Sequence, residues 1–499
     1  MDKNGVLTIS DFQKGQADSP YLGFDTMRAV DITSTPGVAK ISYRTEELTG
    51  FSAIGLPVAY CYDNNGNYYQ LVADTGSGNA LFYKNGSNVS SLTGRGWDMV
   101  YYKGYILIRH GSQLSAYETN YASPTLFQGW KSGYSQTYYG KMLVSKNDGN
   151  VYIADGTSIK RISDFVAGSA GVAPTATADT AIALITGYAA TTIAELGSRL
   201  MVGTQTDNSI WITRYASQGA TIFPYRIGVS ATNFDNPVQI SNANCIQQII
   251  VSNNLMYITA GIKGNVYVSD GTSYRQVKTI PYAVKDESGL GMLLYPNAIT
   301  IASNGNLLIG SSSFTNGYTG DVTQHGIWEI NLATGKYETN LRYIMSNGFF
   351  TGNTQISIGF VYQTNADTVF FGWGYGSDYG IDQTSAYKYT GYKATIETQL
   401  YIVGNKLTPK TFENVEILFG QPLTAGQGIR LSYRLSTYGD YTTIGTWDYS
   451  TVGSVISIRD KALITNAQAL QIKIEMTTQS GTSGIVPSQN IELLSVTLW

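Results

Sequence analysis

One hairpin-like stretch occurs twice in this sequence and constrains the fold more than any other feature. GNVYIADGTSIKRI spans residues 149–162, and GNVYVSDGTSYRQV spans residues 264–277. Each copy reads as a Gly-Asn turn, a strand, a tight Asp-Gly turn and a second strand, and the Asp-Gly pair suits the positive φ values of a type I′ turn. Two copies this similar predict that the middle of the chain is built from a repeated β unit.

The same alternation of apolar runs and turns extends from about residue 51 to about residue 392. It divides into about seven units of short strands, with an Ala/Thr-rich insertion from about 166 to 190. The units begin at Leu56, Trp97, Ser135, Thr191, Cys245, Pro296 and Ile356. Such repeats predict a β-propeller of about seven blades, in which no blade buries its apolar residues without its neighbours.

Beyond about residue 392 the expected strands become longer. In Arg430–Leu435 polar and apolar residues alternate with period two, as an antiparallel sheet with one buried face requires. We therefore expect an antiparallel β-sandwich over residues 393–499, following a propeller over 51–392 and a lead-in segment over 1–50. No run predicts a helix longer than two turns, so the expected fold class is all-β.

Composition limits the classes of partner. Charged residues make up 13% of the chain, beside 54 Gly and 38 Tyr, which suits short strands joined by turns. The net charge is −3 and no run of Lys or Arg exceeds two residues, so no specific nucleic-acid site is expected. No apolar run approaches about 20 residues, and the first residues lack the apolar core of a signal peptide. We expect no membrane segment and synthesis in the cytoplasm.

Cysteine and histidine are too few for most catalytic or metal sites. Cys61 and Cys245 each lie in an apolar, strand-like run, which favours buried free thiols over a disulfide framework. His110 and His325 each precede a glycine and fall in different predicted blades. That separation argues against a histidine-based triad or a multi-histidine metal site. The sequence therefore predicts no catalytic residue, no metal ligand and no cofactor.

Two aspartates occupy the repeated turn. Asp155 and Asp270 each open an Asp-Gly-Thr-Ser sequence, which at first suggests the Asp-box of sialidases. That motif needs Ser-x-Asp-x-Gly-x-x-aromatic, whereas Asp and Gly are adjacent here and no Trp follows at the required place. Turn chemistry explains both aspartates, because Asp accepts hydrogen bonds from backbone N–H groups in turns.

A second polar turn is Asp63-Asn64-Asn65-Gly66-Asn67. Its oxygens could bind Ca²⁺, but the alternating acidic positions and the distant Glu of an EF-hand loop are missing. With Asn-Gly at its centre, the segment is interpreted as a hairpin turn.

The densest aromatic and glycine stretch lies in the last predicted blade. It contains Gly372–Gly376, including Trp373, and continues to Tyr379, Tyr387, Tyr389 and Tyr392. Such side chains pack inside a blade or, when exposed, stack on sugar rings. Packing at the last blade and its junction with the sandwich is the favoured interpretation, and glycan binding stays open.

Two stretches resemble a known family. Residues 14–41, KGQADSPYLGFDTMRAVDITSTPGVAKI, resemble the N-termini of structural proteins of tailed bacteriophages, with their pattern KG…DSP…GF…M…VDI…PGV before a propeller. Residues 410–446, KTFENVEILFGQPLTAGQGIRLSYRLSTYGDYTTIGT, resemble the β-sandwich that follows it. The resemblance implies a non-enzymatic component of the virion tail, forming a nozzle, hub or fibre-attachment ring.

In that interpretation the partners are copies of the same chain in a ring and other tail proteins, such as an adaptor and fibres. DNA would pass through the assembled ring without a specific site on the chain. Two alternatives stay open. One is a carbohydrate-binding or glycan-cleaving propeller on the virion surface, motivated by the aromatic-rich last blade. The other is a bacterial cytoplasmic scaffold propeller with no link to a phage.

Overall fold

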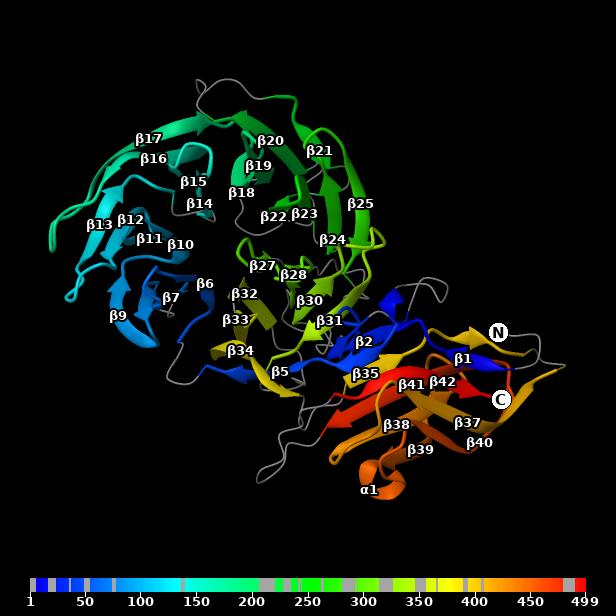
Figure 1. Cartoon of the computed structure of the whole chain (residues 1–499). Helices are drawn as coiled ribbons and strands as arrows, with labels where there is room; N and C mark the ends of the chain where they lie inside the picture. The colour runs from blue at the N-terminus through cyan, green and yellow to red at the C-terminus, as the bar shows by residue number, and fades with distance from the viewer. Residues whose placement is uncertain are drawn as a thin grey trace. The chain divides into compact units, whose positions relative to one another are not determined.

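The structure, a computed structural model, divides the chain into two compact units (Figure 1). The sheet unit comprises Met1–Glu46, Gly326–Phe349 and Thr384–Trp499, and the propeller unit comprises Glu47–His325 and Phe350–Gln383. The structure describes residues 6–499 apart from 17–23, 36, 49–53, 74–77, 136–139, 206–219, 228–234, 241–242, 244, 262–263, 281–291, 294, 314–325, 346–355, 365–366, 389–393, 405–407 and 479–489.

Five four-stranded antiparallel sheets follow one another along the propeller unit, each with its strands in chain order. Their strands are β6 (Pro57–Tyr62), β7 (Tyr68–Val72), β8 (Ala80–Lys84) and β9 (Ser87–Leu92); β10 (Gly96–Tyr102), β11 (Tyr105–His110), β12 (Gln113–Glu118) and β13 (Leu126–Ser132); β14 (Met142–Val144), β15 (Val151–Asp155), β16 (Ser158–Val166) and β17 (Thr175–Ala183); β18 (Ala189–Leu196), β19 (Arg199–Gln205), β20 (Ala220–Arg226) and β21 (Val238–Ile240); and β22 (Ile246–Ser252), β23 (Leu255–Ala260), β24 (Asn265–Ser269) and β25 (Tyr274–Thr279).

Two further groups of strands complete this unit. They are β27 (Ile299–Ile301) with β28 (Leu307–Gly310), and β32 (Ile356–Gln363) with β33 (Val369–Tyr375) and β34 (Asp378–Lys388). A short pair, β26 (Met292–Leu293) and β29 (Ser312–Ser313), flanks β27 and β28 in sequence.

The first strands of successive sheets contact one another in a closed circle. In the described part of the chain the order is β6, β10, β14, β18, β22, β27, β32 and back to β6. The N–H of Leu48, just before the first sheet, donates to Ile381 O of β34 over 2.8 Å, which pairs the entering chain with the last sheet. Consecutive four-stranded sheets around a ring form a β-propeller, so the propeller prediction is confirmed.

Blades are held together by side chains that alternate between their two faces. On β15, Val151 and Ile153 belong to a buried cluster with Leu107 of the preceding blade. Tyr152 and Ala154, on the other face of the same strand, belong to a cluster with residues of the following blade, among them Ile193 and Leu200. Because both faces are buried, the VYIA segment of β15 reads as a continuous apolar run rather than as a polar–apolar alternation.

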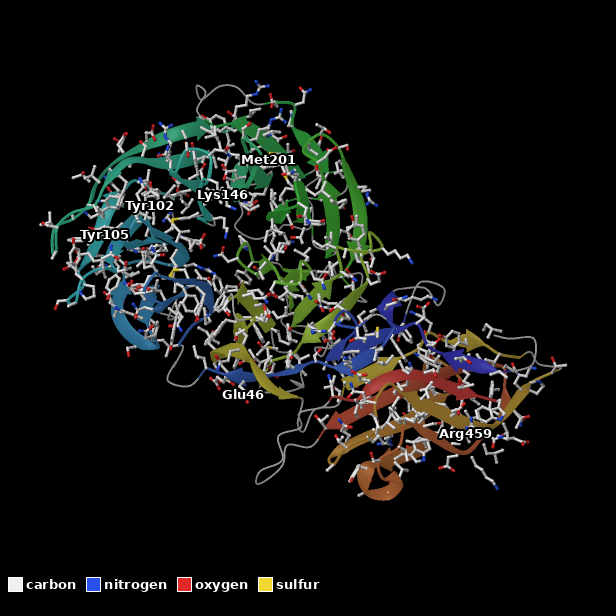
Figure 2. The ribbon with its side chains drawn as sticks, viewed as in Figure 1. Glu46, Tyr102, Tyr105, Lys146, Met201 and Arg459 are labelled. Atoms are coloured by element: carbon white, nitrogen blue, oxygen red, sulfur yellow. The ribbon has the colours of Figure 1, made fainter. Side chains whose placement is uncertain are left out.

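The Ala/Thr-rich insertion is part of a blade. It contains β17, which pairs with β16. Phe165, near the end of β16, packs edge-on against Tyr102 and Tyr105, with ring centroids 5.0 and 5.5 Å apart. Figure 2 labels these two tyrosines, which belong to the preceding blade. Trp130 Nε1 of the preceding blade donates to Pro174 O over 2.7 Å. The insertion therefore ties its own blade to the one before it.

The first copy of the repeated hairpin differs from the predicted turn. Asp155 pairs with Ser158 in the ladder, so the two-residue loop is Gly156-Thr157. Gly156 has φ 61°, and Thr157 is not among the residues with positive φ. This matches a type II′ turn, in which glycine takes the first central position, rather than the expected type I′ turn.

Two larger sheets form the sheet unit, together with the short helices η1 (Phe12–Lys14) and α1 (Tyr449–Val452). The strand β5 (Tyr43–Glu47) spans the point in the sequence at which the chain passes from the sheet unit to the propeller unit. The first sheet has the order β3 (Val30–Asp31), β4 (Ala39–Ile41), β42 (Glu492–Leu498), β37 (Lys410–Phe419) and β40 (Ser457–Ala467), with β1 (Leu7–Ile9) also on β42. Within the unit the second has the order β30 (Ile327–Ile330), β31 (Thr339–Tyr343), β2 (Thr26–Arg28), β35 (Ala394–Glu397), β41 (Ala469–Thr478), β38 (Gln427–Arg434) and β39 (Thr442–Asp448), with β36 (Tyr401–Ile402) on β41.

The expected boundaries 1–50, 51–392 and 393–499 differ from these units. Residues 7–41 do not form a separate lead-in, because β1 and β4 pair with β42, and β2 pairs with β35. The segment Gly326–Phe349, expected in the propeller, belongs to the sheet unit. The described sheets after residue 393 are therefore completed by strands from elsewhere in the chain. Short strands need long-range partners for their backbone hydrogen bonds, and periodicity along the sequence does not reveal those partners.

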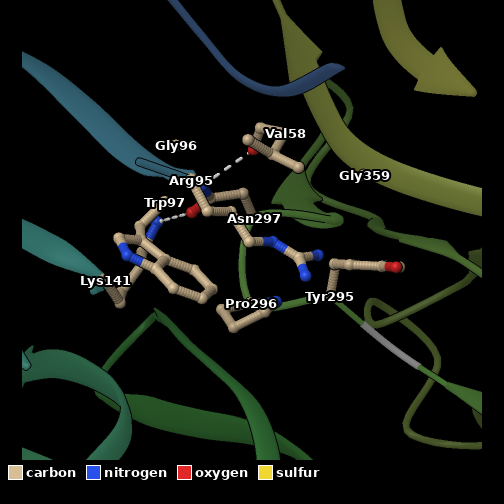
Figure 3. A pocket seen from close by; sticks show the side chains of 9 residues that line it. All are labelled: Val58, Arg95, Gly96, Trp97, Lys141, Tyr295, Pro296, Asn297 and Gly359. Atoms are coloured by element: carbon tan, nitrogen blue, oxygen red, sulfur yellow. Dashed lines mark hydrogen bonds between the residues drawn. The ribbon is translucent and has the colours of Figure 1, made fainter. Parts of the chain in front are cut away.

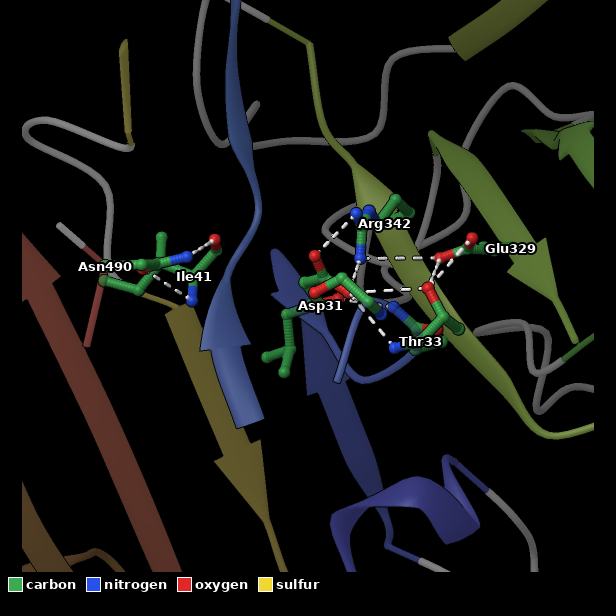
Figure 4. A network of polar contacts seen from close by, with 9 residues as sticks. Asp31, Thr33, Ile41, Glu329, Arg342 and Asn490 are labelled. Carbon is green, nitrogen blue, oxygen red and sulfur yellow. Dashed lines mark hydrogen bonds and ion pairs between the residues drawn. The ribbon is translucent and has the colours of Figure 1, made fainter. Parts of the chain in front are cut away.

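A buried ionic network holds these distant segments of the sheet unit together (Figure 4). Arg342 of β31 pairs with Asp31 of β3 and lies 3.5 Å from Glu329 of β30, and Thr33 Oγ1 donates to Glu329 over 3.2 Å. Burial alone would raise the pKa of Asp31, but Arg342 and the backbone N–H of Ser34 hold it well below its usual range. Asp31 is the acidic residue of the VDI pattern in the N-terminal stretch, so that pattern has a structural role here.

Candidate functional site

The first strands of several blades converge on Asn297 at the centre of the propeller. Its Nδ2 donates to Val58 O over 3.0 Å and to Asp98 Oδ1 over 2.9 Å, and Lys141 Nζ donates to its Oδ1 (Figure 3). The backbone carbonyl of Asn297 accepts the N–H of Val361 over 2.9 Å. One asparagine thus connects the first, second, third and last blades. We call Asn297, Asp98 and Lys141 the axial cluster.

Asp98 is a buried carboxylate whose oxygens are all engaged. They accept the N–H groups of Met99 at 2.8 Å and Met142 at 2.7 Å in addition to Asn297 Nδ2. Lys141 Nζ lies 3.7 Å from Asp98 Oδ2. Burial raises the pKa of Asp98, and Lys141 and the three hydrogen bonds partly offset that rise. These groups satisfy one another, so the axial cluster fits a role in holding blades together.

Two hollows lie at this centre and share two residues, Arg95 and Tyr295. The hollow beside Asn297 has a volume of about 10 Å³, room for about one water molecule. The other, which we call the axial cavity, measures about 210 Å³. It is lined by Leu56, Ala73, Arg95, Tyr295, Ser357, Gly374, Gly376 and Tyr379. In the described part of the chain, Arg95 is the charged residue of that lining.

Arg95 lies against Trp97, with its guanidinium carbon 5.2 Å from the ring centroid. Its Nε is buried without a hydrogen-bond partner. Figure 3 shows its side chain extending past Asn297 toward Tyr295. Burial raises the pKa of Tyr295, while Arg95 and a hydrogen bond with Ser357 act in the opposite direction. Among the described residues Arg95 has no acidic partner.

The two aspartates of the repeated turn are not equivalent. Asp270 is exposed and caps its turn: its Oδ1 accepts the N–H groups of Thr272 at 2.8 Å and Ser273 at 3.0 Å, which lowers its pKa to about 2. Asp155 is buried, accepts the N–H of Ser135 over 2.7 Å and lies 3.3 Å from Arg109 Nη2. The turn interpretation holds for Asp270, but for Asp155 it is wrong, since its carboxylate pairs with a buried guanidinium.

The polar turn at residues 63–67 uses its carboxylate internally. Asp63 Oδ1 accepts the N–H groups of Asn65 at 2.8 Å and Asn67 at 2.9 Å, while Oδ2 accepts Asn67 Nδ2 and the Tyr69 hydroxyl. These hydrogen bonds hold the pKa of Asp63 below its usual value against the effect of burial. The hairpin interpretation is confirmed for this segment.

His110 is also structural. Its Nδ1 lies 2.8 Å from Thr93 O and its Nε2 lies 2.7 Å from Ser115 Oγ, and burial lowers its pKa. His325 lies outside the described residues. Cys61 and Cys245 are buried free thiols, as expected.

In the aromatic stretch, Trp373 is fully buried and its Nε1 donates to Asp382 over 2.8 Å, so it is not available to stack on a sugar. Tyr379 lines the axial cavity. Tyr389 and Tyr392 lie outside the described residues, as does the side chain of Tyr387.

Sequence reasoning missed the axial residues. Trp97 and Asp98 open the second predicted unit, Arg95 lies just before it, and Asn297 lies at the start of the sixth. A charged pair flanking a tryptophan at the head of an apolar strand was an available signal. Its importance depends on which strand ends meet at the centre, and the local sequence does not show that.

Within the described residues no group of three or more His, Cys, Asp or Glu side chains is placed to hold a metal ion. Over the same residues, no helix has both the length and the apolar character needed to span a membrane.

No protein-family model matches this sequence, and no curated protein matches it. Several solved structures are similar in shape. The β-propeller domain of Cps50 (Swd1) from Myceliophteria thermophila has 10% identity and a TM-score of 0.42, with 68% of this chain and all of that chain covered. A putative 6-phosphogluconolactonase from Bacteroides uniformis has 14% identity and a TM-score of 0.40, with 63% of this chain and 94% of that chain covered.

An arabinoxylan arabinofuranohydrolase of glycoside hydrolase family 43 from Bacillus subtilis has 9% identity and a TM-score of 0.31, with 91% of this chain and 98% of that chain covered. All three TM-scores lie below 0.5, so nothing about the activity of this chain follows from these similarities. The propeller assignment rests on its own strand pairing and on the closed circle of first strands.

Proposed function

We propose that this protein is a non-enzymatic structural component of a tailed-bacteriophage virion. It acts in the tail, as a nozzle, hub or fibre-attachment ring built from several copies. The propeller serves as a rigid body, and the sheet unit makes contacts with neighbouring copies and with other tail proteins. DNA passes through the ring formed by the copies, without a specific site on any one of them.

The observation that carries this proposal concerns the two stretches that resemble phage structural proteins. They lie almost 400 residues apart in sequence, yet both contribute strands to the sheet unit. In the first sheet β4 and β37 flank the same strand, β42. Two stretches with one family resemblance thus belong to one folded body, as expected if that body is the attachment part of such a protein.

The centre of the propeller also supports a structural role. The axial cluster connects four blades, its polar groups satisfy one another, and the hollow beside Asn297 holds about 10 Å³. Buried polar networks that are fully satisfied make a body rigid. Among the described residues the axial cluster presents no nucleophile–base pair of the kind that acyl-transfer enzymes use.

The test is the composition of purified particles. Virions are banded on a density gradient, their proteins are identified by mass spectrometry, and the chain is located with an antibody visualised by electron microscopy. We expect the protein in the particle band in several copies per virion, with label at the tail. A protein found only as a free monomer in the lysate of infected cells contradicts the proposal.

The carbohydrate alternative is not adopted as a second candidate. It is motivated by the aromatic-rich last blade, and Trp373, the tryptophan of that stretch, is buried. A glycan array combined with a hydrolysis assay on the purified protein distinguishes the two functions. Glycan binding or turnover together with absence from particles favours the alternative.

A further inference from the structure

We propose that the axial cavity binds a small organic carboxylate, with Arg95 as its counterion. This inference concerns the propeller unit alone and does not depend on the phage assignment. It rests on a charge that no described carboxylate balances, on the hydrogen-bonding residues that line the same cavity, and on the size of the space.

Lys141 and Arg95 are cations near the centre of the propeller, and they differ in their partners. Lys141 is already engaged by Asp98 and Asn297. Arg95 lines both hollows, yet among the described residues it has no carboxylate partner, only the ring of Trp97. A partly buried guanidinium without a counterion is unfavourable, and an anion in the cavity removes that cost.

The lining suits a carboxylate group. Arginine presents planar pairs of N–H donors that match two carboxylate oxygens. Tyr295, Ser357 and Tyr379 line the same cavity, and Tyr295 already shares a hydrogen bond with Ser357. A hydroxyl group can accept one hydrogen bond while it donates another, so these residues can also bond to the anion or to polar groups of the ligand. Gly374 allows this arrangement, since a Cβ there would lie 2.9 Å from Cδ1 of Tyr379.

The same features argue against a phosphate group. Among the described residues of the lining, Arg95 carries the one positive charge and none belongs to a helix N-terminus. A phosphate carries nearly two negative charges at neutral pH and is usually bound by several cations or by clustered N–H groups. One guanidinium balances one carboxylate. The cavity, at about 210 Å³, limits the ligand to a small molecule.

A larger hollow in the sheet unit provides a contrast. It measures about 430 Å³ and is lined in part by Arg430, Asp448 and Glu475. There the charges are already used: Arg430 lies 3.8 Å from Glu475 and Asp448 caps α1. Within the described residues, a guanidinium without a carboxylate partner distinguishes the axial cavity.

The test is isothermal titration of the full chain at constant ionic strength. The probes are acetate, benzoate and D-glucuronate, each compared with a neutral counterpart: acetamide, benzamide and D-glucose. Inorganic phosphate is titrated in parallel. We expect saturable binding of at least one carboxylate, with its neutral counterpart at least tenfold weaker and phosphate weaker than the carboxylate. Failure of all three carboxylates to bind, or tighter binding of phosphate, overturns the proposal.

Variants locate the site. Arg95→Gln should weaken carboxylate binding at least tenfold, and Arg95→Lys should retain part of it because the charge remains while the planar fork is lost. Arg226→Gln is the matched control, because Arg226 is an exposed arginine paired with Asp235 outside the cavity. Thermal unfolding followed by circular dichroism checks that each variant folds. If Arg95→Gln does not fold, Tyr379→Phe is tested in its place. Unchanged carboxylate binding in the folded Arg95→Gln protein, or in Tyr379→Phe where that variant replaces it, contradicts the assignment.

Discussion

Asn297 Nδ2 and Asp98 Oδ1 lie 2.9 Å apart at the centre of the propeller, and this hydrogen bond joins the sixth predicted unit to the second. The same amide group reaches Val58 and Lys141, from the first and third units. Neighbouring blades are also joined by apolar contacts such as those of Ile153 and Leu107, and by polar contacts such as the Arg109–Asp155 ion pair. The axial cluster therefore adds hydrogen bonds, whose geometry is specific, between blades that are not adjacent in sequence.

Asn297→Ala should destabilise the propeller unit. Removing the amide leaves Val58 O without its side-chain donor and takes a donor from Asp98, and each buried group left without a partner costs about 1–3 kcal/mol. Urea denaturation followed by tryptophan fluorescence measures the change. Asn64→Ala, in an exposed position of the Asp63 turn, is the control and should be nearly neutral. Equal stability of the two variants would show that the cluster contributes little.

The two copies of the repeated turn allow a matched pair of substitutions. Asp155→Ala should cost about 3–5 kcal/mol, because it leaves the fully buried Arg109 guanidinium without its charged partner. Asp270→Ala removes only an exposed turn cap and should cost clearly less. Chemical denaturation of both variants, compared with the parent protein, checks the order. A larger loss for Asp270→Ala would contradict the different roles assigned to the two copies.

Acid should destabilise the sheet unit through Asp31. Its folded pKa lies well below its unfolded value, which is about 3.9. Its contribution to stability is therefore fully present above that unfolded pKa, and it is lost as the pH falls from about 4 through the folded pKa. Asp31→Asn should lower stability near neutral pH and flatten this part of the acid dependence. Denaturant midpoints measured from about pH 7 to about pH 2 give the comparison. A variant with the same acid dependence as the parent would exclude Asp31 as its source.

Neither cysteine should react in the native protein. Burial raises the pKa of Cys245 to about 12, and burial together with Asp98 and Asp63 raises the pKa of Cys61. Thiolate is the reactive form, so a thiol-specific reagent at mildly alkaline pH should modify neither side chain until the protein is unfolded in guanidinium chloride. Two equivalents should then react. Rapid modification of the folded protein would show that one thiol is accessible.

Much of the candidate site was out of reach of sequence reasoning. The Asp63 turn was predictable because its hydrogen bonds connect residues within six positions of one another. Arg95 and Asn297, by contrast, are about 200 residues apart in sequence and become neighbours only when the ring closes. Residue type and spacing do not encode that neighbourhood, and neither residue belongs to a local motif.

By itself the sequence determined the repeated hairpin, the all-β class and the burial of VYIA-like strands, since these follow from local periodicity and turn chemistry. Only the tertiary structure decided that Asp155 pairs with Arg109 while Asp270 caps a turn, although both open the same Asp-Gly-Thr-Ser sequence. It also decided that β1 and β4, near the start of the chain, pair with β42, the last strand. The physical reason is common to both cases: a buried charge or an unpaired strand must find a partner, and that partner can lie at any distance along the chain.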